Sequence, residues 1–408
     1  MTQSQALKIL KSGENVFLTG SAGTGKTFLL NQFIGYLKKK KINVGITAST
    51  GIAATHIGGR TIHSWAGMGI ERKLTPKKIT KLLKKKETRK RIKEARILII
   101  DEISMLDADR LDLVDEICRA ARNPFMPFGG IQIILSGDFF QLPPIDKEAR
   151  FAYDSASWKE SKIRVCYLDE QFRQEDLVFT GLLNKIRGNE AGEKEFSLLK
   201  SRLNKSISFF DKPTKLYTHN ADVDAINSFE LSRVSGKESA FQMTERGPKE
   251  LINMIKKACL APEKLKLKIG AVVMFIKNNF EAGYVNGTLG KIVGFNGDNY
   301  PIVKIKSGDE IAAAPASWDI LEDDQVIAGI GQIPLRLAWA ITVHKSQGMS
   351  LDAAEIDLSK SFEYGMGYVA LSRVRTLAGI RLIGINGNAL KIDPRVLERD
   401  QEFKNLSK

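Results

Sequence analysis

The stretch GSAGTGKT, Gly20 to Thr27, decides the fold of this chain. An apolar run at residues 16–18 precedes it, and a run with helical spacing of apolar residues follows it at 28–37. The spacing G-x-x-x-x-G-K-T between a strand and a helix is typical of a phosphate-binding loop. Its glycines let the backbone wrap a phosphate chain, whose charge then faces N–H groups and the helix N-terminus. We predict a nucleoside triphosphate site here; a glycine-rich turn that only caps a helix is the alternative.

Two side chains of this loop have specific expected roles. Lys26 would neutralise the outer phosphates, and the Thr27 hydroxyl would bind Mg²⁺. The predicted cofactors are therefore ATP and Mg²⁺. The rest of the loop is expected to hold the phosphates mainly through its backbone, at Gly20, Ser21, Ala22, Gly23, Thr24 and Gly25.

The charge of the chain points to a nucleic acid partner. The 408 residues carry a net charge of +15, and a basic protein with a nucleotide site is expected to bind nucleic acid. From Arg72 to Lys93 there are twelve Lys or Arg and one acid, Glu87, so this block has a net charge of +11 and leaves +4 for the rest. A block of like charges is typical of an interaction segment. A solvated surface helix, or an arm that keeps the protein soluble, is the alternative.

The cysteines and the hydropathy pattern argue against other classes of protein. Cys118, Cys166 and Cys259 lie far apart and no C-x-x-C occurs, so neither a zinc site nor a disulfide framework is supported. No apolar stretch approaches the roughly 20 residues that span a bilayer, and the first residues lack the apolar region of a signal peptide. We expect no membrane partner and a cytoplasmic location, in association with the nucleoid if the source is prokaryotic.

Short apolar runs alternate with helical patterns, which predicts an α/β fold with parallel sheets. The strands expected for a first sheet are residues 15–18, 43–47, 96–100 and 131–135. A second sheet of the same kind is expected from residues 215–218, 337–343, 354–358 and 380–385.

Two insertions interrupt this alternation. Between about residues 268 and 330 the pattern changes to short strands, at 271–276, 290–295 and 302–305. Asn-Gly pairs at residues 286–287 and 296–297 separate them, and Asn-Gly is the strongest short hairpin signal. We predict a small all-β module inserted into the second domain, and the basic block at 66–96 is predicted to be an insertion in the first.

An acidic pair, Asp101 and Glu102, follows the apolar run at 97–100. Beside a phosphate loop, Asp101 would hold Mg²⁺ through water, and Glu102 would orient and deprotonate an attacking water. The alternative is an acidic pair at a strand end without a catalytic role. The second acid argues against a simple kinase and fits ATP hydrolysis.

Three further residues are candidates for sensing or stabilising the γ-phosphate. Gln141, in GDFFQLPP (137–144), follows a predicted strand, although the two prolines could mark only a rigid turn. Arg173, in LDEQFRQ, and Arg373, in YVALSRVR, could stabilise charge on the transferred phosphoryl group across a domain cleft. Each arginine alone could equally be a surface salt-bridge partner.

Two stretches are candidates for contact with nucleic acid. In VHKSQGMS (343–350), the polar side chains of His344, Lys345 and Ser346 suit a phosphate backbone. The Gly- and Thr-rich stretch at 48–69 could also take phosphates, while His63 and Trp65 could stack on bases. Ordinary core packing is the alternative for these two rings.

Taken in order, these motifs resemble those of the petite-integration-frequency (Pif) helicases, of superfamily one, subclass B, which are related to the RecD helicases. GSAGTGKT and IIDEIS are shared widely among P-loop motors. The specific part is DEISMLDADRLDLVDEICRAAR followed by PFGGIQIILSGDFFQLPP, within residues 101–144. TASTGIAATHIGG with TIHSW, and AITVHKSQGMSLD with YVALSRV, are similarly close. The resemblance covers about residues 3–385.

The resemblance implies an architecture of two RecA-like P-loop domains with parallel sheets, at residues 1–175 and 176–408. It also implies that the module at 268–330 is SH3-like and that the block at 66–96 is the strand-separating wedge. Three departures stand out: Trp65 replaces an expected Phe, Met366 replaces a frequent Gln, and the block is more basic than expected for a wedge.

The resemblance further implies roles for single residues. Gln3, or Gln5 because the spacing is ambiguous, would recognise adenine, and Gly348 would join the nucleotide site. Gln141 would couple the γ-phosphate to DNA, and Arg173 and Arg373 would be two arginine fingers. The residues expected to contact single-stranded DNA are Thr50, Gly51, His63, Thr342, His344 and Ser346.

The predicted function is an ATP-dependent DNA helicase that moves 5′ to 3′ on single-stranded DNA, as a monomer in solution. Its expected partners are single-stranded DNA and tailed or forked duplex DNA, and structures such as G-quadruplexes. The direction and the G-quadruplexes rest on the resemblance. The alternative is a DNA-stimulated ATPase that clamps or remodels nucleoprotein without unwinding. A small-molecule kinase needs neither Glu102, nor a second sheet, nor the basic excess.

Overall fold

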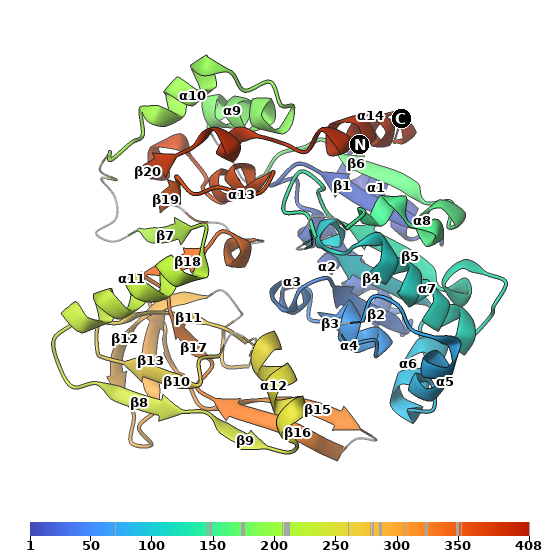
Figure 1. The fold of residues 1–408 in the computed structure, drawn as a ribbon, viewed down its shortest axis with the longest axis horizontal. Coiled ribbons are helices and arrows are strands. Elements are labelled where there is room, and N and C mark those ends of the chain that lie inside the picture. The colour runs from blue at the N-terminus through green and yellow to red at the C-terminus, as the bar shows by residue number, and fades with distance from the viewer. Residues whose placement is uncertain are drawn as a thin grey trace. The chain divides into compact units, whose positions relative to one another are not determined.

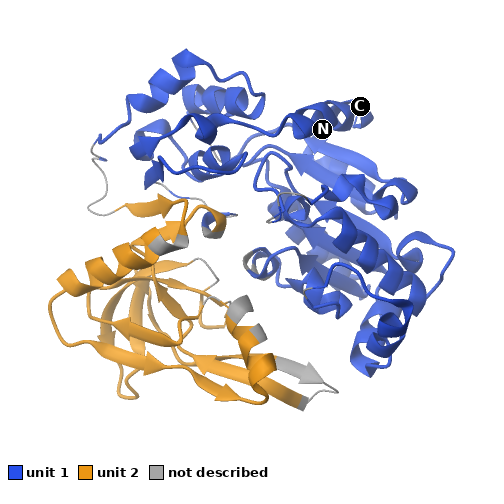
Figure 2. Cartoon of the chain, viewed as in Figure 1, with its two compact units in different colours: residues 1–209, 346–408 blue, residues 210–345 orange. Residues whose placement is uncertain are grey.

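The structure is a computed structural model of residues 1–408. It describes all of them except residues 70, 145, 147–148, 173–175, 206, 208–212, 260, 278, 280, 285–287, 306, 323–324, 348–350, 352 and 408. The predictions for Arg173, Gly348, the side chain of Lys345 and the turn at 286–287 therefore lie outside the described residues. The chain divides into two compact units: unit 1 is residues 1–209 with 346–408, and unit 2 is residues 210–345 (Figure 2).

Unit 1 contains a six-stranded parallel sheet with the order β3-β2-β4-β5-β1-β6 (Figure 1). Its strands are β1 Val16–Gly20, β2 Val44–Ala48, β3 Arg60–Thr61, β4 Ile97–Asp101, β5 Gln132–Ser136 and β6 Arg164–Leu168. Four of them match the strands predicted for the first sheet to within two residues at each end. The edge strands β3 and β6 were not predicted.

One helix precedes these strands, and further helices and short 3₁₀ turns connect them. The helices are α1 Gln3–Leu10, α2 Lys26–Lys39, α3 Gly51–His56, α4 Ile62–Ala66, α7 Ala108–Ala121 and α8 Ala156–Glu160. The 3₁₀ turns are η1 Ile103–Met105, η2 Pro127–Gly130 and η3 Ala152–Asp154. Strands β1 and β4 are buried along their whole length, as expected for parallel strands with both faces covered. Leu29, Leu30 and Phe33 of α2 pack against this sheet, which fixes the helix that follows the phosphate loop.

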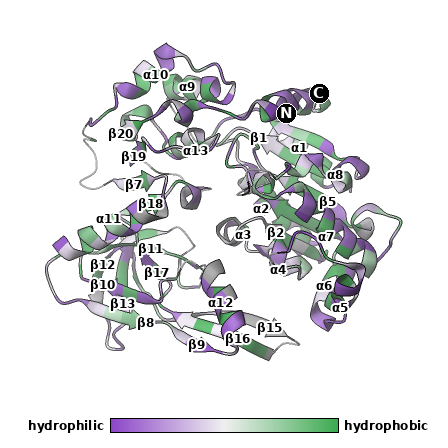
Figure 3. Cartoon of the chain, in the orientation of Figure 1, coloured by the Kyte–Doolittle hydropathy of each residue, from purple (hydrophilic) through white to green (hydrophobic). Residues whose placement is uncertain are grey.

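The basic block forms two helices, α5 Pro76–Leu82 and α6 Lys86–Glu94. Ile79 and Ile92 are buried, and the Nη1 of Arg122 donates to the carbonyl of Lys93 at 3.1 Å and so caps the end of α6. Hydrophilic residues lie along both helices, in contrast to the hydrophobic strands of the sheet (Figure 3). The block is therefore a folded pair of amphipathic helices between β3 and β4, and most of its charges face solvent.

The remaining elements of unit 1 follow β6 or come from the last part of the chain. They are α9 Leu177–Arg187, α10 Glu193–Lys200, η4 His344–Ser346 at the boundary of the units, β19 Ala354–Leu358, α13 Met366–Ser372, η5 Leu377–Gly379, β20 Ile380–Ile385, η6 Gly387–Leu390 and α14 Pro394–Leu406. β19 and β20 are parallel partners. Helix α14 returns to the first sheet, where Phe403 stacks edge-on against Phe17 of β1, with ring centroids 5.0 Å apart.

Unit 2 combines one parallel pair of strands with a larger antiparallel part. β7 Thr214–Tyr217 pairs in parallel with β18 Ala340–Thr342, beside α11 Asn220–Arg233. The four strands predicted for a second sheet are all present and form one sheet of order β18-β7-β19-β20. The antiparallel part has a five-stranded sheet of order β14-β13-β12-β11-β17. The other elements are α12 Lys249–Ala258 and the small sheets β10-β8 and β15-β16-β9.

The strands of the antiparallel part are β8 Ser239–Gln242, β9 Thr244–Arg246, β10 Lys264–Leu267, β11 Val272–Phe275, β12 Leu289–Phe295, β13 Pro301–Ile305, β14 Glu310–Ala312, β15 Ala316–Glu322, β16 Gln325–Gln332 and β17 Leu335–Leu337. The predicted β module is confirmed as β structure, but β8, β9 and β10 begin it before residue 268. The predicted β12–β13 hairpin is present, although its positive φ lies at Asn299 and not at Gly297, so the loop is longer than a two-residue Asn-Gly turn. None of the described helices is long and apolar enough to cross a membrane.

Candidate nucleotide-binding site

The phosphate loop joins β1 to α2 and depends on its glycines. Gly20, Gly23 and Gly25 all have positive φ, and a Cβ on Gly20 would lie 2.6 Å from the carbonyl oxygen of Leu168. Gly25 is the N-cap of α2 and offers no side chain to the first N–H groups of the helix. Those N–H groups are therefore suited to bind an anion, as the sequence predicts.

Lys26 is held inside this loop. Its Nζ donates to the carbonyl oxygens of Gly20, at 2.7 Å, and Ser21, at 3.1 Å. Burial lowers the pKa of Lys26, and the nearby carboxylates of Asp138 and Glu102 oppose that shift. The two carbonyl groups thus hold the ammonium in the phosphate loop, where burial disfavours its charge and the negative charge of a phosphate chain would favour it.

Asp101 and Glu102 end β4 beside the loop. Asp101 accepts a hydrogen bond from the backbone N–H of Glu102 at 2.9 Å. Burial raises the pKa of Asp101. Burial and the nearby negative charge of Asp101 raise the pKa of Glu102 to about 7. A carboxylate whose pKa lies near neutrality suits a general base.

Gln347 orients the side chain of Glu102. Its Nε2 donates to the Oε2 of Glu102 at 3.1 Å, and the Gln347 side chain is buried. We did not predict Gln347, although it belongs to the VHKSQGMS stretch. The available signal was its position, as a polar residue beside His344 and Ser346. That position is compatible with contact to DNA or with contact to the nucleotide site.

Gln141 lies on a buried loop that follows β5. Its Nε2 is 3.5 Å from the Oδ2 of Asp138, which is fully buried. Among the described residues, the Oε1 of Gln141 is buried and has no hydrogen-bond partner. This acceptor is available to a water molecule near the phosphates.

Helix α13 brings a tyrosine and an arginine to the same region. The hydroxyl of Tyr368 accepts a hydrogen bond from the backbone N–H of Ala22, in the phosphate loop, at 2.9 Å. Arg373, one turn further on, is 1% exposed, and its guanidinium donates to the Val369 carbonyl and the Ser372 hydroxyl, each at 2.9 Å. The positive charge of Arg373 also acts to lower the pKa of Glu102. We did not predict Tyr368.

The N-terminal helix distinguishes the two candidate adenine residues. The Nε2 of Gln3 donates to the carbonyl of Thr24 at 3.1 Å, whereas the side chain of Gln5 closes a capping box with Thr2. Beside Gln3 lies Phe172, whose ring is 61% exposed and 3.7 Å from the point where a Cβ on Gly25 would be. We did not predict Phe172, because a single aromatic in a loop carries no motif.

The residues predicted to contact DNA from unit 1 lie in different environments. Thr50 caps the start of α3, where its hydroxyl accepts from the N–H of Ala53, and Gly51 is exposed. His63 is partly buried, and burial lowers its pKa. Trp65 is 2% exposed and packs against Gly45, so this geometry favours the core-packing alternative for its ring.

The other predicted DNA contacts follow β18. Thr342 and Ser346 are buried, and His344 is partly buried in η4. Thr342 and His344 belong to unit 2, and Ser346 belongs to unit 1.

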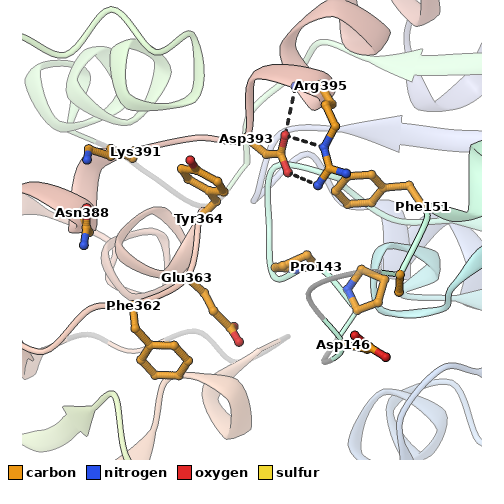
Figure 4. Close-up of a pocket in the computed structure, with 12 residues that line it drawn as sticks. Pro143, Asp146, Phe151, Phe362, Glu363, Tyr364, Asn388, Lys391, Asp393 and Arg395 are labelled. Carbon is orange, nitrogen blue, oxygen red and sulfur yellow. Dashed lines mark hydrogen bonds and ion pairs between the residues drawn. The ribbon is translucent and has the colours of Figure 1, made fainter.

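A cavity of about 370 Å³ lies beside the loop that carries Gln141 (Figure 4). Pro143 and Phe151 line one part of it, and Phe362 and Tyr364 line another. The phosphate-loop residues do not line this cavity. It is therefore separate from the cluster around Lys26.

Comparisons with known proteins agree with this site. The family model described as PIF1-like helicase matches residues 3–186, and the model described as DNA helicase Pif1, 2B domain, matches residues 250–295. The ATP-dependent DNA helicase Pif1 of Psychrobacter is 42% identical, and the match covers 100% of this chain and 71% of that protein. For the human ATP-dependent DNA helicase PIF1 the identity is 37%, and the chain spans 62% of that protein's length.

Solved structures are similar over nearly the whole chain. The Pif1 helicase of Candida albicans matches with a TM-score of 0.89 at 36% identity, over 98% of each chain. The Pif1 helicase of Bacteroides in complex with ADP-AlF3 and single-stranded DNA matches with a TM-score of 0.74 at 32% identity, over 99% of this chain and 96% of that one. The predicted α/β fold class with RecA-like domains is thereby confirmed.

Proposed function

The chain belongs to the PIF1-like helicase family, whose members hydrolyse ATP, and we propose that it moves 5′ to 3′ along single-stranded DNA and unwinds tailed or forked duplexes. The observation that carries the proposal is the cluster of Lys26, Glu102 and Arg373 in unit 1. Asp138 connects this cluster to Gln141, because it influences the charge of Lys26 and accepts from the Gln141 side chain. One end of the cluster binds phosphates and the other provides a base. Such an arrangement hydrolyses a nucleoside triphosphate.

ATP would be held at three points. The loop N–H groups and Lys26 bind the phosphates, Gln3 recognises the base edge, and the exposed ring of Phe172 stacks on the adenine. The Thr27 hydroxyl and the Asp101 carboxylate are oxygen donors of the kind that Mg²⁺ prefers. When bound, Mg²⁺ would neutralise charge on the β- and γ-phosphates.

Hydrolysis would then depend on five side chains of this chain. Glu102, held by Gln347, takes a proton from the attacking water, and Gln141 orients that water through its Oε1. Arg373, with Arg173 as the second arginine finger, stabilises the charge of the transferred phosphoryl group. The nearby Arg373 helps to keep Glu102 ionised in the working site.

Movement would follow from alternating affinity for one DNA strand. The proposed contacts are Thr50, Gly51, His63, Trp65, Thr342, His344, Lys345 and Ser346, and among these Trp65 would need to leave its buried position. Melting costs about 1.4 kcal/mol per base-pair step, which one ATP per step can supply. We further propose that the substrates include G-quadruplexes, that the chain acts as a monomer, and that it is cytoplasmic.

Strand displacement on two partial duplexes tests this function. One duplex carries a 5′ single-stranded tail and the other a 3′ tail, and each is mixed with ATP and Mg²⁺. We expect unwinding of the 5′-tailed duplex alone, and no unwinding by the Lys26→Ala variant. Unwinding of the 3′-tailed duplex alone would overturn the direction. DNA-stimulated ATP hydrolysis without unwinding would instead favour the alternative function, an ATPase that clamps or remodels nucleoprotein.

A further inference from the structure

A buried ionic network lies next to the nucleotide cluster and has no part in the mechanism above. Arg187, at the end of α9, donates through Nη2 to the Oδ1 of Asp138 and to the Oδ1 of Asp400, each at 3.2 Å. Its Nη1 donates to the hydroxyl of Tyr167 at 2.6 Å, and this hydroxyl donates to Asp400 at 3.0 Å. All four side chains are buried within unit 1.

One end of the network holds the loop that carries Gln141. Asp138 accepts from the backbone N–H of Phe140 and from the side chain of Gln141, and the guanidinium of Arg187 lies 4.0 Å from the centroid of the Phe140 ring. Arg187 therefore contacts residues 138 and 140 of the loop whose residue 141 is proposed to orient the attacking water. Asp138 also lies close enough to Lys26 to influence its charge.

The other end of the network belongs to the C-terminal helix. Asp400 lies on α14, where Lys404 makes a second ion pair with it at 2.9 Å. The same helix is fixed to β6 by a hydrogen bond from the N–H of Tyr167 to the Ser407 hydroxyl at 2.9 Å. A displacement of α14 would therefore remove Asp400 from Arg187.

Such a network is not explained by stability alone. Burying charges is costly even when they are paired, and apolar residues of similar volume often stabilise a core as well or better. The network does specify one orientation of Arg187, and through it one conformation of loop 138–141.

We propose that Arg187 and Asp400 are positioning residues for ATP hydrolysis: they hold loop 138–141 so that Gln141 is aligned, and they make the rate depend on the docking of α14. The inference rests on the role of Gln141 in the proposed function. Neither residue touches the phosphates, so each acts through Asp138.

The test is a double-mutant cycle measured by steady-state ATP hydrolysis with saturating single-stranded oligonucleotide and Mg²⁺. Asp400→Asn keeps the shape of the side chain and leaves Arg187 paired with Asp138. We expect it to lower kcat by about fivefold or more, with KM within about twofold. In a Gln141→Ala background the same change should alter kcat by less than about twofold, because interacting sites are not additive.

Tyr167→Phe is the second variant, in case Asp400→Asn folds poorly. We expect it to lower kcat by less than Asp400→Asn does, and we expect this effect also to depend on the presence of Gln141. Glu402→Gln, on the exposed face of α14, is the matched control and should leave kcat unchanged. Melting temperatures of all variants separate positioning from loss of fold.

Two outcomes would overturn the inference, and they can be told apart. If Gln141→Ala lowers kcat but Asp400→Asn has no effect, or the same effect in both backgrounds, then the positioning role is wrong and the proposed function stands. If Gln141→Ala itself leaves kcat unchanged, the role of Gln141 in the proposed function is wrong, and the positioning role fails with it.

Discussion

Two features of Glu102 are energetically unfavourable, and a residue with only a structural role would avoid them. Its backbone is left-handed, with φ 51° and ψ 46°, which costs a non-glycine residue about 1–2 kcal/mol. Its carboxylate is buried beside a second carboxylate, which disfavours the ionised form. Strain and desolvation at one residue are typical of a functional site.

The raised pKa of Glu102 predicts a pH dependence of hydrolysis. A general base must be ionised, and a pKa of about 7 means that the ionised fraction falls as the pH drops below 7. We expect kcat/KM for ATP to rise about tenfold between pH 6 and pH 8 and then to level off. Glu102→Gln should abolish most of the activity and this pH dependence with it, whereas Glu402→Gln should keep both. A flat wild-type profile from pH 6 to 8 would contradict the assignment.

A second prediction for a single residue concerns Phe172 and its proposed stacking on the adenine. Stacking of a base on an aromatic ring contributes about 1–3 kcal/mol, so Phe172→Ala should raise KM for ATP at least about fivefold. Its kcat should change little, because the ring would contact the base and not the groups that act on the attacking water. Phe229→Ala is the matched control, since both rings are 61% exposed and Phe229 lies on α11 in unit 2. Equal KM values for the two variants would exclude the stacking role.

The sequence predicts residues that belong to a motif and misses those that act singly. Lys26, Asp101 and Glu102 have a fixed spacing from a strand, so their place at the sheet edge follows from the fold. Tyr368 and Phe172 reach the phosphate loop only through tertiary packing, and no local pattern records such a contact.

The block at residues 72–93, which includes α5 and nearly all of α6, carries +11 of the net charge of +15. The buried side chains of Ile79 and Ile92 anchor the two helices. Because the helices are folded and pack against α4 and α7, their lysines form a defined surface and not a loose arm. A defined basic surface can track a phosphate backbone, with a salt dependence set by the number of phosphates it contacts.

Removing four of these charges should flatten the salt dependence of DNA binding. Each lost phosphate contact lowers the slope of log K against log salt by about 0.7–0.9. The variant with Lys77, Lys78, Lys81 and Lys84 changed to Gln should therefore lower the slope by up to about 3, measured by fluorescence anisotropy of a labelled oligonucleotide. The charge-matched control changes the exposed run at residues 38–41 to Gln and should have a smaller effect. Equal slopes for the two variants would mean that the block is only a solvated face.

Prediction of the elements succeeded where a hydrophobic pattern was long enough. β4 and β5 are continuous apolar strands of a parallel sheet, and their bounds were found to within one residue. β8 and β10 are four-residue strands with one face exposed, so their alternation is too short to separate from a loop. β3 has two residues and exists only through its pairing with β2.

At the scale of the whole chain, the first and last segments pack together. The amino group of Met1 donates to the carbonyl of Tyr167, and the N–H of Tyr167 donates to the hydroxyl of Ser407. Edge strand β6 is thereby covered by both ends of the chain. A covered edge cannot pair with a strand of another copy, which removes one common route to self-association.

The same reasoning predicts that the chain is a monomer in the absence of DNA. A net charge of +15 makes two copies repel each other, and most of that charge lies in one block. Sedimentation velocity at 0.15 M salt should therefore give a single species near the mass of one chain. At 1 M salt the Debye length falls to about 3 Å, so the repulsion is screened. We expect a monomer there too, because both ends of the chain cover the edge of β6. A dimer only at high salt would mean that charge alone keeps the copies apart, and a dimer at both salt concentrations would contradict the monomeric motor.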